Sequence, residues 1–126
     1  MSFTPLPVHV RTARLVATAV ARRSGVQEAL LDEVRLAVGE ACSRAVEAHR
    51  AHCPTEPVRL ALTELAGRFE VEVTDTSMAG GGDGTAAYPP GFGIAVIAGL
   101  ADDVQISETP AGTSIRMSWP SAVTAS

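Results

Sequence analysis

The sequence predicts an α+β fold, a two-layer sandwich in which a mostly antiparallel sheet is covered on one face by three helices. Three observations predict it. Residues 30–49 have the period of a long amphipathic helix, two pairs of alternating segments have the pattern of β-hairpins, and a short apolar helix lies between those pairs. A length of 126 residues is enough for one domain, residues 1–126, and too short for two.

The long helix is expected from about Gln27 to Ala51, since Pro54 forbids its continuation. Its apolar side consists of Leu31, Val34, Val38, Ala41, Cys42 and Ala45. Its polar side consists of Asp32, Glu33, Glu40, Ser43, Arg44 and Glu47. Glu40 and Arg44 lie four residues apart, and a solvated ion pair worth about 0.3 kcal/mol is the simplest explanation of that spacing alone.

The segment before the long helix is predicted to hold a strand and a helix. Thr4 to Val10 alternates and contains two prolines, which is typical of a short edge strand. Arg11 to Arg23 then repeats alanine, leucine and valine at helical spacing until Ser24-Gly25 ends it.

Two strictly alternating segments follow, Val58 to Leu65 and Phe69 to Thr74. The turn Ala66-Gly67-Arg68 between them predicts an antiparallel hairpin. One side of it is apolar and is expected to face the helices: Val58, Leu60, Leu62, Phe69, Val71 and Val73. The charged residues Arg59, Glu70 and Glu72 are expected to face solvent.

The second half of the chain contains a glycine-rich segment without any period, and we expect residues 76–90 to form a flexible lid. A short apolar helix opens at Gly91-Phe92-Gly93 and ends at Leu100. Asp102 to Ser107 and Gly112 to Trp119 are predicted to form a second hairpin. Residues 120–126 are expected to form a C-terminal tail.

Composition excludes several classes of protein. The net charge is -4 without a basic run, which argues against direct nucleic-acid binding. No apolar run approaches the roughly 20 residues that a membrane span requires.

Cys42 and Cys53 lack CxxC spacing and a preceding signal peptide, so we expect reduced thiols and a cytoplasmic protein. His49, His52 and Cys53 cluster at one helix end without a second ligand group, so no metal site is predicted.

Four features in this order resemble the GHKL (HATPase-type) ATPase superfamily, and specifically its small anti-sigma-factor serine kinases. They are Glu40 on the long helix, Asp75 at a strand end, Gly91-Phe92-Gly93 opening a helix, and Gly112-Thr113-Ser114 at the start of the last strand. The segments LAVGEACSRAVEAH and GFGIAVIAGLADDVQIS carry most of the likeness, which covers Val8 to Trp119.

The resemblance implies a role for each of these residues around bound ATP or ADP. Glu40 would be the catalytic acid that polarises a water or hydroxyl near the γ-phosphate. Asp75 would accept a hydrogen bond from the adenine amino group, with help from Thr113. The glycine box from Gly91 through Phe92 to Gly93 would let the backbone approach the phosphates.

Two departures from the family pattern point to a degenerate kinase. The family places a magnesium-ligating asparagine four residues after the helix acid, where this sequence has Arg44, and a guanidinium has no lone pair for a cation. We therefore expect no bound magnesium and poor nucleotide binding, with Arg44 paired to phosphate oxygens or to Glu40. The first glycine box, normally Asp-x-Gly-x-Gly, begins at Asp75 and contains Ser77 and Ala79 in place of its glycines.

These observations lead to three hypotheses about function. The first is a regulatory protein that sequesters a sigma factor and is controlled by a STAS-domain antagonist, with weak or absent kinase activity. The second is an active ATP-dependent serine kinase that phosphorylates that antagonist. The third is an inert dimerisation module without nucleotide. The resemblance also implies a homodimer, although no surface in the sequence identifies one.

Overall fold

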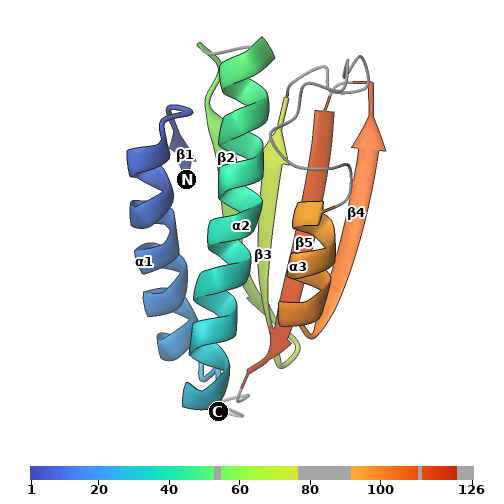
Figure 1. The fold of residues 1–126 in the computed structure, drawn as a ribbon. Helices are drawn as coiled ribbons and strands as arrows, with labels where there is room; N and C mark the ends of the chain where they lie inside the picture. Colours follow the sequence, from blue (N-terminus) through green and yellow to red (C-terminus); the bar gives the residue numbers. More distant parts are fainter. Residues whose placement is uncertain (53–54, 77–91, 111, 122–126) are drawn as a thin grey trace.

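The computed structural model describes residues 1–52, 55–76, 92–110 and 112–121. Within them, five strands form one sheet in the order β1-β2-β3-β5-β4, and every neighbouring pair is antiparallel. The elements are β1 Ser2–Phe3, α1 Pro7–Arg23, α2 Glu28–His52, β2 Val58–Leu65, β3 Arg68–Asp75, α3 Phe92–Leu100, β4 Asp103–Thr109 and β5 Gly112–Pro120. The three helices lie side by side on one face of the sheet (Figure 1), which confirms the predicted two-layer α+β sandwich. Of the helices in these ranges, none combines the length and apolar character that crossing a membrane requires.

The N-terminal prediction is wrong in one place. Thr4 to Val10 does not form a strand, because only Ser2–Phe3 pairs with β2 and Pro7 already begins α1. Proline suits the first turn of a helix, where its missing N–H would have no partner, and the extended Leu6 forms the cap before it. The predicted helix therefore ends at Arg23 as expected but begins at Pro7.

The long helix α2 extends from Glu28 to His52, within one residue of both predicted ends. All the residues of its predicted apolar side are buried. Helix α2 packs against α1 on one side and α3 on the other and crosses β3. It is thus the element around which the helical layer is arranged (Figure 1).

The first hairpin is antiparallel as predicted, but its turn is one residue shorter than expected because Arg68 belongs to β3. Leu65 pairs with Arg68, which leaves Ala66 and Gly67 as the turn, both with positive φ, 54° and 77°. This backbone twist matches the twist of paired strands. Of the residues predicted to face the helices, only Leu62 is partly exposed, and it still packs against the core.

The last strand of the sheet, β5, connects the sheet to α3 through Trp119. Trp119 is fully buried beside Phe69, with ring centroids 6.4 Å apart. The Trp119 indole Nε1 donates a hydrogen bond to the carbonyl oxygen of Leu100 at 3.2 Å. Because Leu100 is the last residue of α3, this bond holds the end of the helix against the sheet.

The opposite face of the sheet is polar, as the alternation predicted. Glu70 and Glu72 lie on this face and share one cation, with Arg116 Nε 3.7 Å from Glu70 Oε1 and Arg116 Nη2 3.6 Å from Glu72 Oε2. Ser114 donates a hydrogen bond to Glu72 Oε2 at 2.6 Å. A hydrated charged network of this kind needs no second helical layer.

Candidate functional site

The residues singled out by the sequence meet at the end of the sheet where β3 stops and β5 starts. Asp75 is the last residue of β3 and stands opposite Thr113 in the antiparallel register. Their relative exposures are 2% and 4%, so both polar side chains are buried. A carboxylate enclosed in this way needs partners among the groups around it.

Gly112 makes the close approach of the two strands possible. Its φ of +145° is unfavourable for a residue with a side chain. A β-carbon at this position would overlap the carbonyl oxygen of Asp75 and lie 2.9 Å from the Cα of Thr76. Glycine is therefore required here to place Thr113 beside Asp75, a reason that the sequence motif alone did not reveal.

The charged partner of Asp75 is Arg44, which approaches from α2. Arg44 Nη1 donates a hydrogen bond to Asp75 Oδ2 at 3.4 Å, and the arginine side chain is 26% exposed. Phosphate oxygens and Glu40 were the two partners expected for Arg44. The pairing with Glu40 is corrected, because no ion pair joins Arg44 and Glu40 in the described chain. The physical reason is burial, since a carboxylate at 2% exposure gains more from a neighbouring cation than a half-buried one.

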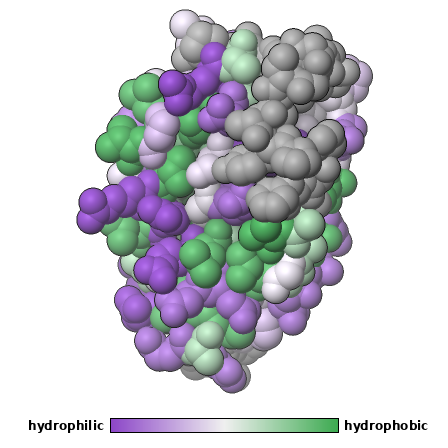
Figure 2. All heavy atoms as spheres, viewed as in Figure 1, coloured by the Kyte–Doolittle hydropathy of each residue, from purple (hydrophilic) through white to green (hydrophobic). Residues whose placement is uncertain are grey.

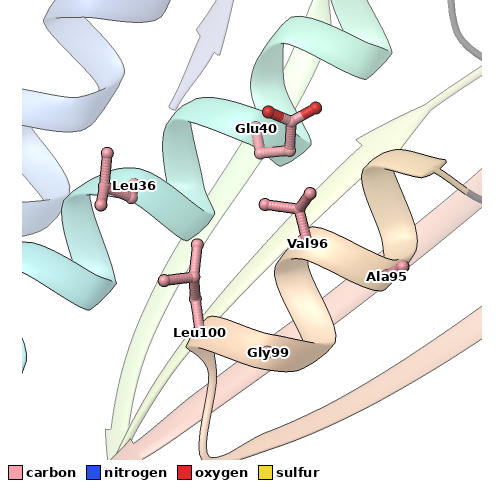
Figure 3. Close-up of a pocket in the computed structure, with 6 residues that line it drawn as sticks. All are labelled: Leu36, Glu40, Ala95, Val96, Gly99 and Leu100. Atoms are coloured by element: carbon pink, nitrogen blue, oxygen red, sulfur yellow. The ribbon is translucent and has the colours of Figure 1, made fainter.

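Glu40 lies one helical turn before Arg44 and faces α3. It lines a groove of about 440 Å³ together with Leu36, Ala95, Val96, Gly99 and Leu100. Figure 3 shows its carboxylate above Val96, while Leu36 of α2 and Leu100 of α3 lie toward the other end of the groove. Its Oε2 atom is buried and has no hydrogen-bond partner in the structure described. Glu40 is therefore the candidate acid whose Oε2 atom is held by no side chain among the described residues.

The second glycine box is described only in part. Phe92 is the first residue of α3 and Gly93 lies within its first turn. Gly91 lies outside the described residues, as does the predicted lid apart from Thr76.

His49 is a structural residue that sequence reasoning missed. It is fully buried at the end of α2, and its Nε2 accepts a hydrogen bond from the Thr76 backbone N–H at 2.9 Å. Since a backbone N–H can only donate, Nδ1 carries the imidazole proton, and it lies 2.8 Å from the Glu56 carbonyl oxygen that accepts it. One side chain thus joins the end of α2, the segment before β2 and the residue after Asp75.

Cys42, on the apolar side of α2, is a free and fully buried thiol. Burial raises the pKa of this thiol to about 12, and the nearby Arg14 opposes part of that rise. The thiolate required for nucleophilic chemistry is therefore negligible at neutral pH. Cys42 belongs to the core and not to the site.

A family model described as the histidine kinase-like ATPase domain matches residues 3–119. The chain belongs to this family. The match also supports the predicted GHKL superfamily. A search of curated proteins found no match.

Among solved structures, this histidine kinase-like domain is similar to the RsbU and RsbW domains of Rv1364c from Mycobacterium tuberculosis, with a TM-score of 0.72 and 17% identity. The similarity covers 96% of this chain and 31% of that one, so this chain spans about a third of the length of its relative. At this identity the likeness concerns the fold.

The donor set of this histidine kinase-like domain does not suit a magnesium ion. Arg44 stands where the family resemblance places the metal ligand, and its guanidinium points at Asp75. Magnesium prefers oxygen ligands in octahedral geometry, and a guanidinium offers only N–H donors with a positive charge. Within the described residues there is no group of three His, Cys, Asp or Glu side chains that could hold a metal.

Proposed function

We propose that this chain is a regulatory binding protein of the anti-sigma type with weak or absent kinase activity. It sequesters a sigma factor and is controlled by a STAS-domain antagonist that competes for it. The family membership and the likeness to an RsbW-containing structure support this class of protein. The observation that carries the proposal is the ion pair between Arg44 and Asp75.

The ion pair opposes nucleotide binding at the residue to which the resemblance assigns adenine recognition. The adenine amino group would have to displace or share the Arg44 guanidinium, which is a charged and therefore stronger partner for the Asp75 carboxylate. The same guanidinium repels the magnesium ion that phosphoryl transfer requires. ATP or ADP therefore binds poorly, and what remains of the family's function is the binding of proteins.

The alternative function is an active serine kinase, and one observation favours it. Glu40 is not engaged by Arg44, and its Oε2 has no hydrogen-bond partner in the described chain. A carboxylate that is not held in an ion pair can still accept a proton from a serine hydroxyl. Glu40 is the catalytic residue in that case, and Arg44 remains the obstacle to the metal.

Titration calorimetry tests the proposal with the sigma factors and STAS-domain proteins of the host. We expect at least one of them to bind with micromolar affinity or better, in the presence or absence of ATP. Binding to none of them would contradict the regulatory function. We further propose that the protein acts in the cytoplasm, where the buried thiol of Cys42 stays reduced, and that it can pair as a homodimer.

Nucleotide affinity separates the two functions. For the wild type, ATP binding is expected to be weak and equal in magnesium and in EDTA, with negligible phosphorylation of a STAS serine. Arg44→Asn removes the cation and supplies a neutral carbonyl one turn after Glu40, so magnesium-dependent ATP binding is expected to increase. Strong magnesium-dependent binding and phosphotransfer by the wild type would establish the kinase instead.

A further inference from the structure

The groove between α2 and α3 has an apolar half and an acidic end. Leu36 is 50% exposed on α2 and lines the groove together with Leu100 of α3 (Figure 3). Glu40 lies at the other end and is the only charged residue that lines the groove in the described chain. Hydrophobic atoms are visible at the surface over these two helices in Figure 2.

The floor of the groove is open. A β-carbon built on Gly99 meets no atom within 4 Å, and Ala95 one turn earlier has the smallest side chain. On the α2 side the described part of the groove is bordered by Leu36, whose side chain is half exposed. Small-molecule sites enclose most of their ligand, which the described residues of this groove do not do. A helix laid between two helices is the ligand that suits an open apolar groove.

Charge complementarity identifies what that helix must carry. Glu40 Oε2 is buried without a hydrogen-bond donor in the described residues. A buried carboxylate oxygen without a donor is unfavourable, so a donor that arrives with a ligand gains the missing interaction. Lysine and arginine are the side chains that supply such a donor with a compensating charge.

The spacing of the groove matches one turn of a helix. Leu36 and Glu40 are four residues apart on α2, which corresponds to about 6 Å along the helix axis. On a partner helix, side chains four residues apart are separated by the same distance and point the same way. An apolar side chain against Leu36 and Leu100 then places a basic side chain at Glu40.

We propose that the groove between α2 and α3 binds a helix of a partner protein that presents an apolar anchor and, one turn away, a lysine or arginine that donates to Glu40. The proposal rests on the proposed partner-binding function and names the surface that serves it. The partner helix buries the exposed half of Leu36 and supplies the donor that Glu40 Oε2 lacks.

A synthetic peptide tests the groove without knowledge of the natural partner. The probe is an alanine- and glutamine-based helical peptide of about 18 residues, longer than the length at which isolated helices are marginal. It carries one leucine and one lysine four residues apart, and a second peptide has norleucine in place of the lysine. Binding is followed by NMR of the methyl groups of Leu36, Val96 and Leu100.

We expect saturable shifts of these methyl signals, and binding of the norleucine peptide that is weaker by a factor of about ten or more, the lower end of what one charged hydrogen bond contributes. Glu40→Gln should reduce that preference to nearly nothing. Gly99→Leu places a side chain in the groove, at a position where a β-carbon meets no atom within 4 Å, and should weaken binding of the lysine peptide about tenfold. The matched control is Ala98→Leu, which adds the same side chain at an exposed position of α3 outside the groove.

Three results would overturn the proposal: no saturable shift at peptide concentrations on the order of millimolar, equal affinity for the two peptides, or equal effects of Gly99→Leu and Ala98→Leu. Thermal unfolding of each variant confirms that it is folded, and Leu36→Gln provides a second groove variant that does not alter α3. A failure of the peptide with intact binding of a sigma factor or STAS protein would reject the groove and leave the proposed function standing.

Discussion

Removal of the Arg44 guanidinium should destabilise the fold by an amount that reflects the burial of Asp75. Breaking a fully buried ion pair typically costs about 3–5 kcal/mol, and an exposed pair contributes about 0–1 kcal/mol. Asp75 is 2% exposed, but Arg44 is 26% exposed and the contact is 3.4 Å. We therefore expect Arg44→Met to lower the free energy of unfolding by about 2 kcal/mol, which corresponds to a fall in Tm of about 8 °C for a domain of this length.

Urea denaturation of the four proteins of a double-mutant cycle measures the interaction free energy between Arg44 and Asp75. The cycle combines Arg44→Met with Asp75→Asn, which keeps the shape of the side chain and the groups that surround it. A coupling free energy of about 1 kcal/mol or more is expected. The control is Arg50→Met, an exposed arginine of the same helix, which should change stability by less than about 0.5 kcal/mol. A coupling below about 0.3 kcal/mol would refute the claim that Arg44 holds Asp75.

Three further predictions concern the residues around the site and the core. Gly112→Ala should lower the free energy of unfolding, measured by urea denaturation, by about 3 kcal/mol or more, because the added β-carbon overlaps the Asp75 carbonyl oxygen. A smaller loss than for a surface alanine substitution would be inconsistent with the close approach of the two strands. His49→Leu should cost about 2–4 kcal/mol through two lost buried hydrogen bonds, and His49→Gln should recover part of it, whereas equal losses would argue against those bonds. In a Cys53→Ser background, Cys42 should resist thiol reagents at pH 8 until the protein unfolds. The pKa of the Cys42 thiol is about 12 in the folded protein and 9.0 ordinarily. The contribution of the protonated thiol to stability is therefore full below about pH 9 and is lost as the pH rises to about 12.

Most of the fold could be predicted because its elements have clear periods. The alternation of β2 and β3 and the apolar side of α2 each left one interpretation, and the structure confirms them. The segment after β1 failed because Pro7 is compatible with both an edge strand and the first turn of a helix. The four residues from Pro7 to Val10 are too few for the spacing of apolar residues to distinguish a strand from a helix.

The site was harder to predict, since its contacts connect residues distant in sequence. Spacing suggested Glu40 as the partner of Arg44, but the sheet brings Asp75 closer, 31 residues later in the chain. Nothing around His49 in the sequence shows that its ring nitrogens meet Thr76 and Glu56. Such contacts depend on the packing of α2 across the sheet, which a local pattern does not encode.

The single tryptophan gives this domain a built-in optical label for one helix. Trp119 is fully buried, and its indole N–H is bonded to the carbonyl oxygen of the last residue of α3. Indole emission depends on the polarity and hydrogen bonding around the ring. Global unfolding should therefore move the emission to longer wavelength, whereas a displacement of Leu100 with the core intact should alter its intensity at nearly constant wavelength. A fluorimeter alone can thus distinguish motion of α3 from loss of the fold, without any attached dye.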